Sequence, residues 1–399
     1  MAFHVRYPHW LPAAPRPGIK VIATLFFIET FARASIATVI PIQAYDLLQD
    51  EQKVSLVYTG AGLAALGLSV IIPLLIRLTS RRWTYTIGAL LLIAAAGLLA
   101  TFTVPGQVAG MVTRVAGAAC LNVTLSLYIL DYIRKEQYVQ NDAVRMTFST
   151  VGWTVAPYLG VWVYSNYGAA AAFSMSSVFA VILIAVFWYL RLSDAIVIVK
   201  ARTPAANPLR YFGRFFSQKR LRVAWFVAFS RSSFWSTLYV YGPLLMITSG
   251  LGAEAGGILI SAANAMLVLT FVFARLSGKL GIRKLAAFSF CISALLCFVC
   301  GYSAADFPIV TAGLLLVASG AVVGLDAVGG VAFYRAVRPY ERAEMTSVYR
   351  TYLDMGELLP PLLYAFLLGF FGLGSVFVAL GGLMGIAALV VLLNIPRRM

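Results

Sequence analysis

Two opposite charges stand four residues apart in the first apolar run of the chain. Glu29 and Arg33 are the only charged residues in FFIETFARASIATVIP, which covers residues 26–41. On a helix this spacing places both side chains on one face. An arginine stays protonated in proteins and can bind an anion, whereas a carboxylate in a medium of low dielectric constant can take up a proton and become neutral. The spacing therefore predicts either a structural ion pair or a site where a proton and an anionic ligand compete for Arg33.

Other ionisable residues deep in apolar runs are few, and such residues are costly in a membrane and usually mark a substrate or ion pathway. The further deep charges are Arg114, Arg231, Asp326, Asp354 and Glu357. We interpret Glu357 and Asp326 as further candidate proton sites, because the only histidines, His4 and His9, lie in the N-terminal tail. The alternative is that each arginine pairs with an acid or a carbonyl group and contacts no ligand.

The stretch around Glu357 combines charge with helix-breaking residues. Arg350, Asp354 and Glu357 follow one helix face at i, i+4 and i+7. We expect Arg350 and Asp354 to form a structural pair near the inner membrane surface. Glu357 lies deeper and precedes Pro360 and Pro361 by three and four residues. A proline pair frees backbone carbonyls, which a membrane tolerates only where the helix is buried or lines a cavity.

The elements that must position these charges are membrane-spanning helices. The chain has 399 residues, of which 61% are hydrophobic and 12% charged, against about 25% charged residues in soluble domains. Its net charge of +16 lies mainly in alternate connections between the apolar runs, and the intervening connections carry one cation, Lys53. This asymmetry follows the positive-inside rule, predicts cytoplasmic termini and argues against nucleic-acid binding.

Twelve apolar runs are each long enough to cross about 30 Å of hydrocarbon as a helix. The predicted spans are 20–45, 54–77, 84–104, 107–131, 145–165, 168–191, 221–248, 255–275, 284–303, 309–334, 344–371 and 374–394. The predicted units are a six-helix half at 1–191, a linker at 192–220 and a second six-helix half at 221–399. The basic, aromatic and proline-containing linker is interpreted as a tether on the inner membrane surface, with a regulatory arm as the alternative.

The two halves resemble each other, which predicts a duplicated unit of six helices. The shared features are an R-x-S-x-x-[T/S] pattern in the first spans, a basic loop after the second spans, a polar residue in the fourth and a proline in the fifth. Parallel repeats related by an axis along the membrane normal are a known plan of transporters. The corresponding residues are Arg33 with Arg231 and Arg77 with Arg275, both at an offset of 198, Asn122 with Asp326, and Pro157 with Pro360.

Three motifs carry a resemblance to the major facilitator superfamily. ARLSGKLGIRK, residues 274–284, is similar to the superfamily's G-x-L-x-D-R-x-G-R-R loop, with Gly278 at the acidic position. RVAGAACLN, which begins at Arg114, resembles the fourth-span motif of proton-coupled members. GWTVAPYLG, residues 152–160, resembles the fifth-span motif of the drug:proton antiporter branch, with Ala156 in place of a glycine. The resemblance implies an all-α membrane protein with twelve transmembrane helices in two pseudo-symmetric halves.

The segment GWTVAPYLG also has a direct physical interpretation. Gly152, Ala156 and Gly160 form a smooth stripe for close helix approach, and Pro157 removes a backbone donor and bends the helix. A packed, kinked helix and a role in antiport both stay open on this evidence. The residues expected to act in gating or helix packing are Arg77, Gly152, Ala156, Pro157, Gly160, Arg275, Gly281, Arg283, Pro360 and Pro361.

In this superfamily the first helix of each half lines a central cavity, which implies that Arg33 and Arg231 face each other. Two guanidinium groups favour a carboxylate, phosphate or sulfate, and the spacing of Arg33 and Pro41 resembles that of organophosphate:phosphate antiporters. Aromatic residues expected in the cavity suit an organic substrate, with lipid-interface anchoring as the alternative for Tyr158 and Tyr241. The candidate substrate-binding residues are Arg33, Arg231, Gln43, Asn122, Trp153, Trp235 and Tyr239, and the candidate proton-coupling residues are Glu29, Asp326, Glu357 and Arg114.

Together, the residues and the resemblance predict a proton-coupled secondary transporter of a small amphiphilic, anionic organic solute. We expect it to work by alternating access as a monomer in a bacterial-type inner membrane. The alternatives are a multidrug:proton efflux antiporter, a transporter of lipids or lipid-linked solutes, and a non-transporting membrane sensor or scaffold. We expect no enzyme activity, no cofactor and no metal site, because catalytic and nucleotide-binding motifs are missing and the four cysteines are interpreted as packing residues.

Overall fold

The computed structural model describes residues 19–79, 81–132, 138–189, 208–338 and 342–396, and this part of the chain is almost entirely helical. The helices up to residue 189 are α1 (Ile19–Ala37), α2 (Val39–Leu48), α3 (Glu51–Leu78), α4 (Arg81–Ala100), α5 (Val104–Tyr132) and α6 (Tyr138–Tyr189). The later helices are α7 (Pro208–Ser217), α8 (Lys219–Thr248), α9 (Ala253–Ala265), α10 (Thr270–Leu280), α11 (Ile282–Ser303), α12 (Pro308–Val328), α13 (Val331–Ala336), α14 (Arg342–Tyr349), α15 (Thr351–Leu368) and α16 (Gly374–Asn394).

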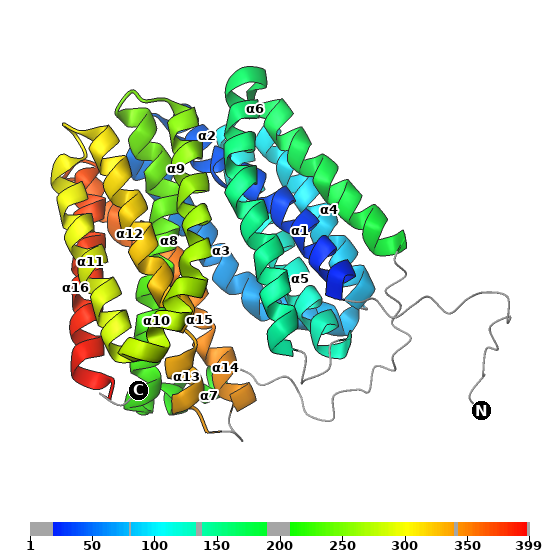
Figure 1. Cartoon of the computed structure of the whole chain (residues 1–399). Coiled ribbons are helices and arrows are strands. Elements are labelled where there is room, and N and C mark those ends of the chain that lie inside the picture. Colours follow the sequence, from blue (N-terminus) through cyan, green and yellow to red (C-terminus); the bar gives the residue numbers. More distant parts are fainter. Residues whose placement is uncertain (1–18, 80, 133–137, 190–207, 339–341, 397–399) are drawn as a thin grey trace, which may run out of the picture.

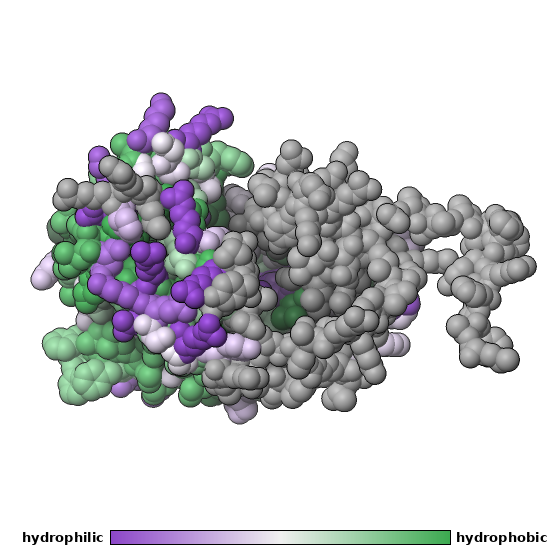
Figure 2. Space-filling model, turned by 90° about the horizontal axis from the view of Figure 1, so that it is seen from below, coloured by the Kyte–Doolittle hydropathy of each residue, from purple (hydrophilic) through white to green (hydrophobic). Residues whose placement is uncertain are grey.

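The helices form two bundles that stand side by side (Figure 1). The N-terminal bundle contains α1 to α6 and the C-terminal bundle α8 to α16. We call the end that carries α7, α13 and α14 the basic end, because Arg214, Lys219 and Arg220 are exposed there. The opposite end, with Asp50 and Glu51 at the turn between α2 and α3, is called the acidic end. Figure 2 looks onto the basic end, where hydrophilic side chains gather over the C-terminal bundle.

Backbone irregularities divide the first predicted span and the long helix α6. The predicted continuous span at 20–45 is broken at Thr38, between α1 and α2. Pro41 explains the break, because it has no N–H to donate to the carbonyl of Ala37. α6 is divided at Gly168, where φ is 83° and ψ is 176°. Only glycine adopts this conformation readily, and the break separates the predicted spans 145–165 and 168–191.

Helices occupy all the predicted spans, but their composition differs. By length and hydropathy, eight helical segments of the described residues could cross a membrane, and the segment Thr147–Tyr189 contains two predicted spans. α3, α8 and α15 lie outside this count. α8 carries Arg231, and α15 carries Asp354 and Glu357. Hydropathy therefore does not identify α8 and α15 as membrane spans, although both carry candidate site charges.

The small-residue stripe of α6 packs against α1. Ala156 is fully buried beside Ala34, in a cluster that includes Phe31. The closest approach is at Gly160, where an added Cβ atom would lie 1.6 Å from the carbonyl oxygen of Ser35. At Gly152 the same atom would lie 2.9 Å from Thr30 Cγ2. The packing interpretation of this stripe is confirmed.

Gly160→Ala should destabilise the N-terminal bundle strongly, because the new methyl group would overlap the Ser35 carbonyl. Overpacking costs about 1–3 kcal/mol of folding stability. The atom that the new methyl group would meet belongs to the backbone of α1 and cannot move aside easily, so we expect a loss near the upper end of this range. Thermal melting and the monodisperse yield of the purified protein measure the effect. Gly97→Ala is the control, since a Cβ atom at Gly97 meets nothing within 4 Å. Equal melting temperatures for the two variants would contradict this account of α1–α6 packing.

Candidate functional site

Glu29 and Arg33 form an ion pair inside the N-terminal bundle. Arg33 Nη1 donates a hydrogen bond to Glu29 Oε1 at 3.1 Å. The same nitrogen donates to Asn122 Oδ1 of α5 at 3.2 Å. The Glu29 side chain is 1% exposed and the Arg33 side chain 22% exposed. The predicted pairing at i, i+4 is therefore present, with the guanidinium group nearer to solvent than the carboxylate.

Arg114 brings a second guanidinium group to the same place. Its Nη2 atom donates to the backbone carbonyl of Arg33 at 3.5 Å, which is the outer limit of a hydrogen bond. Among the residues that the structure describes, Arg114 makes no ion pair, and its buried Nε atom has no hydrogen-bond partner. Two cations from α1 and α5 thus lie together, and one of them has no anionic partner in the described protein.

Glu357 lies on the opposite bundle and faces these cations. It shares a face of α15 with Pro360, Pro361 and Tyr364, which are all buried. Glu357 itself is exposed, although it points inward. Its carboxylate interacts electrostatically with Arg114 and Arg33. An inward-facing residue that is exposed must line a solvent-accessible space, which we call the central cavity.

In the C-terminal bundle the corresponding charges neutralise each other. Arg231 of α8 forms an ion pair with Asp326 of α12 through its Nη1 atom. Trp235 Nε1 donates to the second carboxylate oxygen of Asp326 at 3.1 Å. Arg231 Nη2 donates to the hydroxyl oxygen of Tyr352 at 3.2 Å. Arg231 is therefore held by its neighbours, as the alternative interpretation of the deep arginines predicts.

Aromatic side chains connect the two bundles beside these charges. The rings of Trp153 on α6 and Tyr239 on α8 lie 5.3 Å apart. Tyr239 also donates a hydrogen bond to Asn264 Oδ1 at 2.7 Å. Tyr58 of α3 interacts electrostatically with Arg114 and Glu357, which places it at the same cavity. Tyr58, Asn264 and Tyr352 were not among the predicted site residues. Asn264 contacts the preceding helix α8, whereas Tyr352 joins α15 to α8 across 121 residues.

Among the described residues, the hydrogen bonds between the bundles lie at the acidic end and between that end and the cavity. The hydroxyl groups of Ser55 and Tyr241 lie 2.6 Å apart, and Asn166 Nδ2 donates to Glu254 Oε1 at 3.4 Å. Between these contacts and the cavity, the backbone N–H of Tyr158 donates to Ser261 Oγ at 3.0 Å. Among the described residues no hydrogen bond joins the bundles at the basic end.

Several predicted residues lie outside the cavity. Gln43 is fully buried, and its amide donates to the Leu99 carbonyl at 2.8 Å and to Gln107 Oε1 at 3.0 Å. It joins three helices of the N-terminal bundle, so its predicted place in the substrate site is wrong for this conformation. The predicted pair of Asp354 with Arg350 is absent among the described residues. The helix is interrupted at Arg350, between α14 and α15, so the two residues do not belong to one continuous helix.

The loop residues lie on the basic side of the C-terminal bundle. Arg275 is exposed on α10, and Gly281 joins α10 to α11 with a φ of 81°. Arg283 donates to the carbonyl oxygen of Leu392 on α16. The side chain of Arg77 falls outside the part that the structure describes. These positions fit a structural loop and place none of the described loop residues at the central cavity.

The sequence itself shows the family. The family model of the Major Facilitator Superfamily matches residues 22–268. The chain belongs to the major facilitator superfamily. This confirms the predicted fold class and makes the chain a multi-pass membrane protein of the secondary-transporter type. No curated protein sequence matches the chain.

Solved transporter structures share this major facilitator fold. A POT family transporter in complex with a thioalcohol conjugated peptide is 15% identical, with a TM-score of 0.75 over 94% of this chain and 95% of that one. The nucleoside transporter NupG is 16% identical, with a TM-score of 0.73 over 95% and 100%. A peptide transporter POT in complex with sulfate is 16% identical, with a TM-score of 0.75 over 96% and 95%. At these identities the likeness shows the fold alone.

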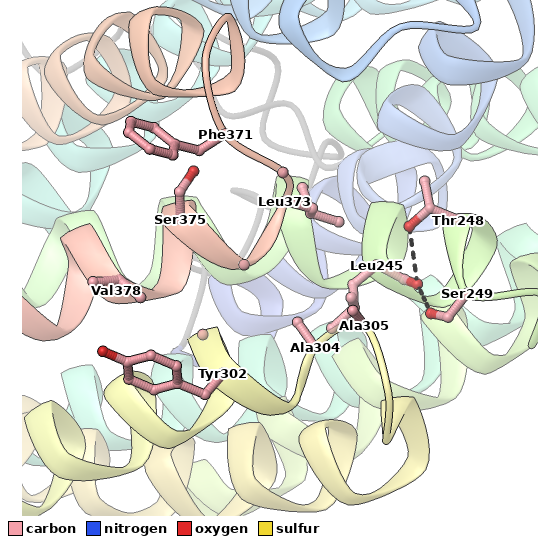
Figure 3. Close-up of a pocket in the computed structure, with 13 residues that line it drawn as sticks. Leu245, Thr248, Ser249, Tyr302, Ala304, Ala305, Phe371, Leu373, Ser375 and Val378 are labelled. Atoms are coloured by element: carbon pink, nitrogen blue, oxygen red, sulfur yellow. Dashed lines mark hydrogen bonds between the residues drawn. The ribbon is translucent and has the colours of Figure 1, made fainter.

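A separate cavity of this major facilitator chain lies at the acidic end of the C-terminal bundle (Figure 3). It has a volume of about 570 Å³ and is lined by the ends of α8, α11 and α16 and by the loop before α16. Its polar side chains are hydroxyl groups such as those of Thr248, Ser249 and Ser375, and none of the lining residues carries a charge. It therefore has no part in the charged site.

Proposed function

We propose that this chain is a proton-coupled transporter of a small amphiphilic organic solute with an anionic group. The observation that carries the proposal is the pair of guanidinium groups at Arg33 and Arg114 in the central cavity. A carboxylate, phosphate or sulfate would gain two charge-assisted partners there. Trp153, Trp235 and Tyr239 offer the apolar surface that suits an organic body.

Proton coupling is assigned to Glu29. The ionised carboxylate holds Arg33, and a protonated Glu29 would hold it less strongly. Uptake of a proton at Glu29 would then free Arg33 for the solute, and bound solute would in turn favour protonation, because coupling between two ligands is reciprocal. Asp326 fits this role less well, since Arg231 and Trp235 both bind its carboxylate.

The proposed topology has twelve membrane spans and both termini in the cytoplasm of a bacterial-type cell. The halves 1–191 and 221–399 would rock about the central cavity, with 192–220 as the tether. On this assignment the basic end is cytoplasmic, and the described conformation is inward-facing. The protein would act as a monomer, with the bilayer, protons and a small solute as its partners.

Efflux of cationic drugs is a second candidate, and exposed Glu357 is the observation that favours it. The same cavity holds Arg33 and Arg114, which would repel a ligand that carries only positive charge. Drug susceptibility of cells that overproduce the protein separates the two functions. We expect no broad resistance to cationic drugs.

Gradient-driven transport tests the leading proposal. A thermal-shift screen of small carboxylates, phosphates and sulfates with apolar bodies selects the probe, because a bound ligand raises the melting temperature. The labelled probe is then offered to proteoliposomes with an imposed pH gradient. We expect transport that responds to the gradient and stops when a protonophore dissipates it. Transport at the same rate without a gradient would contradict proton coupling.

A further inference from the structure

Two charged residues of the central cavity, Arg114 and Glu357, take no part in an ion pair with any described residue. Arg33 is paired with Glu29, and Arg231 with Asp326. Of the other deep charges in the described residues, Arg114, Asp354 and Glu357 form no ion pair, and Asp354 lies one turn nearer the basic end than Glu357. Half-buried charges are normally paired, so half-buried Arg114 calls for an anion, whereas exposed Glu357 offers its carboxylate to the cavity.

Arg114 and Glu357 belong to opposite bundles. Arg114 lies on α5 and Glu357 on α15. The two groups interact electrostatically but form no ion pair, so the guanidinium nitrogens and the carboxylate oxygens lie more than 4.0 Å apart. Beside Glu357, α15 packs closely on α3 of the N-terminal bundle, since an added Cβ atom at Gly62 would lie 3.0 Å from Leu358 Cα and 3.2 Å from the Glu357 carbonyl oxygen. Arg114 and Glu357 therefore present opposite charges to the cavity from the two bundles.

We propose that the solute is a zwitterion, whose anionic group binds Arg114 and whose ammonium group binds Glu357. This inference rests on the proposed function, because it adds a cationic group to the solute assigned there. A solute with one anionic group alone would bring a second negative charge to the cavity that holds the Glu357 carboxylate, and like charges repel. A zwitterion gives both Arg114 and Glu357 a partner of opposite charge and adds no net charge to the cavity.

The apolar part of such a solute would lie against the aromatic groups at the cavity. Tyr58 lies near both unpaired charges, and Trp153 and Tyr239 bridge the bundles. An aromatic amino acid has the required groups, namely a carboxylate, an ammonium group and an apolar body. L-Phenylalanine, 3-phenylpropionate and 2-phenylethylamine form a matched series, because the second lacks the ammonium group and the third lacks the carboxylate.

The experiment measures binding of the three compounds to the purified full-length protein at pH 7. Dissociation constants come from the dependence of melting temperature on ligand concentration. L-Phenylalanine should bind at least about tenfold more tightly than either partner compound, as expected for one charged hydrogen bond. Glu357→Gln should remove the advantage over 3-phenylpropionate, and Arg114→Gln should remove the advantage over 2-phenylethylamine.

Two further variants serve as controls. Glu357→Asp keeps the charge and should retain the order of affinities. Asp354→Asn removes a carboxylate one turn nearer the basic end of the same helix and should leave all three affinities unchanged. These variants show whether a loss of affinity follows the charge at Glu357 or a general change in α15.

The outcomes separate the two proposals. Equal binding of L-phenylalanine and 3-phenylpropionate by the unmodified protein, with both weakened by Arg114→Gln, would overturn the zwitterion and keep the anion site. A transport defect in Glu357→Gln with unchanged affinities would also overturn it, because Glu357 would then act as a contact between the bundles. Affinities for both carboxylates that are insensitive to Arg114→Gln would overturn the anion site as well.

Discussion

Arg33→Gln should abolish gradient-driven transport and lower stability. The substitution removes one guanidinium group of the anion site and with it the ion pair that this group forms with Glu29, which is 1% exposed. Removing one partner of a buried ion pair costs about 3–5 kcal/mol, because the other charge stays buried. The melting temperature of the purified variant and uptake by proteoliposomes measure the two effects.

The double variant Glu29→Gln/Arg33→Gln separates folding from function. With two neutral amides, no buried charge is left at either position, so most of the lost stability should return. Transport should stay absent, because neither amide binds an anion strongly or exchanges a proton. Full transport by Arg33→Gln would show that the Arg33 guanidinium group is dispensable and would contradict the anion site.

Asp326→Asn should have a comparable effect on the C-terminal bundle. The asparagine leaves Arg231, whose side chain is 19% exposed, without its carboxylate and weakens the hydrogen bond from Trp235. The expected loss of stability is again about 3–5 kcal/mol. Thermal melting is the measurement, and Asp306→Asn is the control because Asp306 is exposed before α12. Melting of Asp326→Asn at the temperature of the unmodified protein would return Asp326 to the candidate proton sites.

The sequence predicted those features of the structure that depend on residues close together in the chain. The Glu29–Arg33 pair follows from a spacing of four on one helix, and the close approach at Gly160 follows from the spacing of small residues. The break at Gly168 falls between two predicted spans, where glycine can adopt a positive φ. The twofold organisation was visible as an offset of 198 between Arg33 and Arg231.

Contacts between distant helices were harder to predict. Arg33 and Asn122 were each candidates, but their hydrogen bond joins positions 89 residues apart. Gln43 was assigned to the wrong place, because its amide binds Leu99 and Gln107, which lie 56 and 64 residues away in the sequence. The sequence predicted that Glu357 lies deep in its helix. Its exposure depends on how the two bundles are arranged, and the sequence of a single helix does not predict that arrangement.

The central claim is that a proton at Glu29 is coupled to the solute at Arg33, and Glu29→Gln tests it most directly. The measurement compares two activities of the same proteoliposomes, solute exchange without a gradient and net movement driven by a pH gradient. The neutral glutamine mimics protonated Glu29, so Arg33 should stay available to the solute. The account predicts that exchange continues while the response to the pH gradient is lost. A pH-gradient response equal to that of the unmodified protein would contradict the assignment of the proton to Glu29.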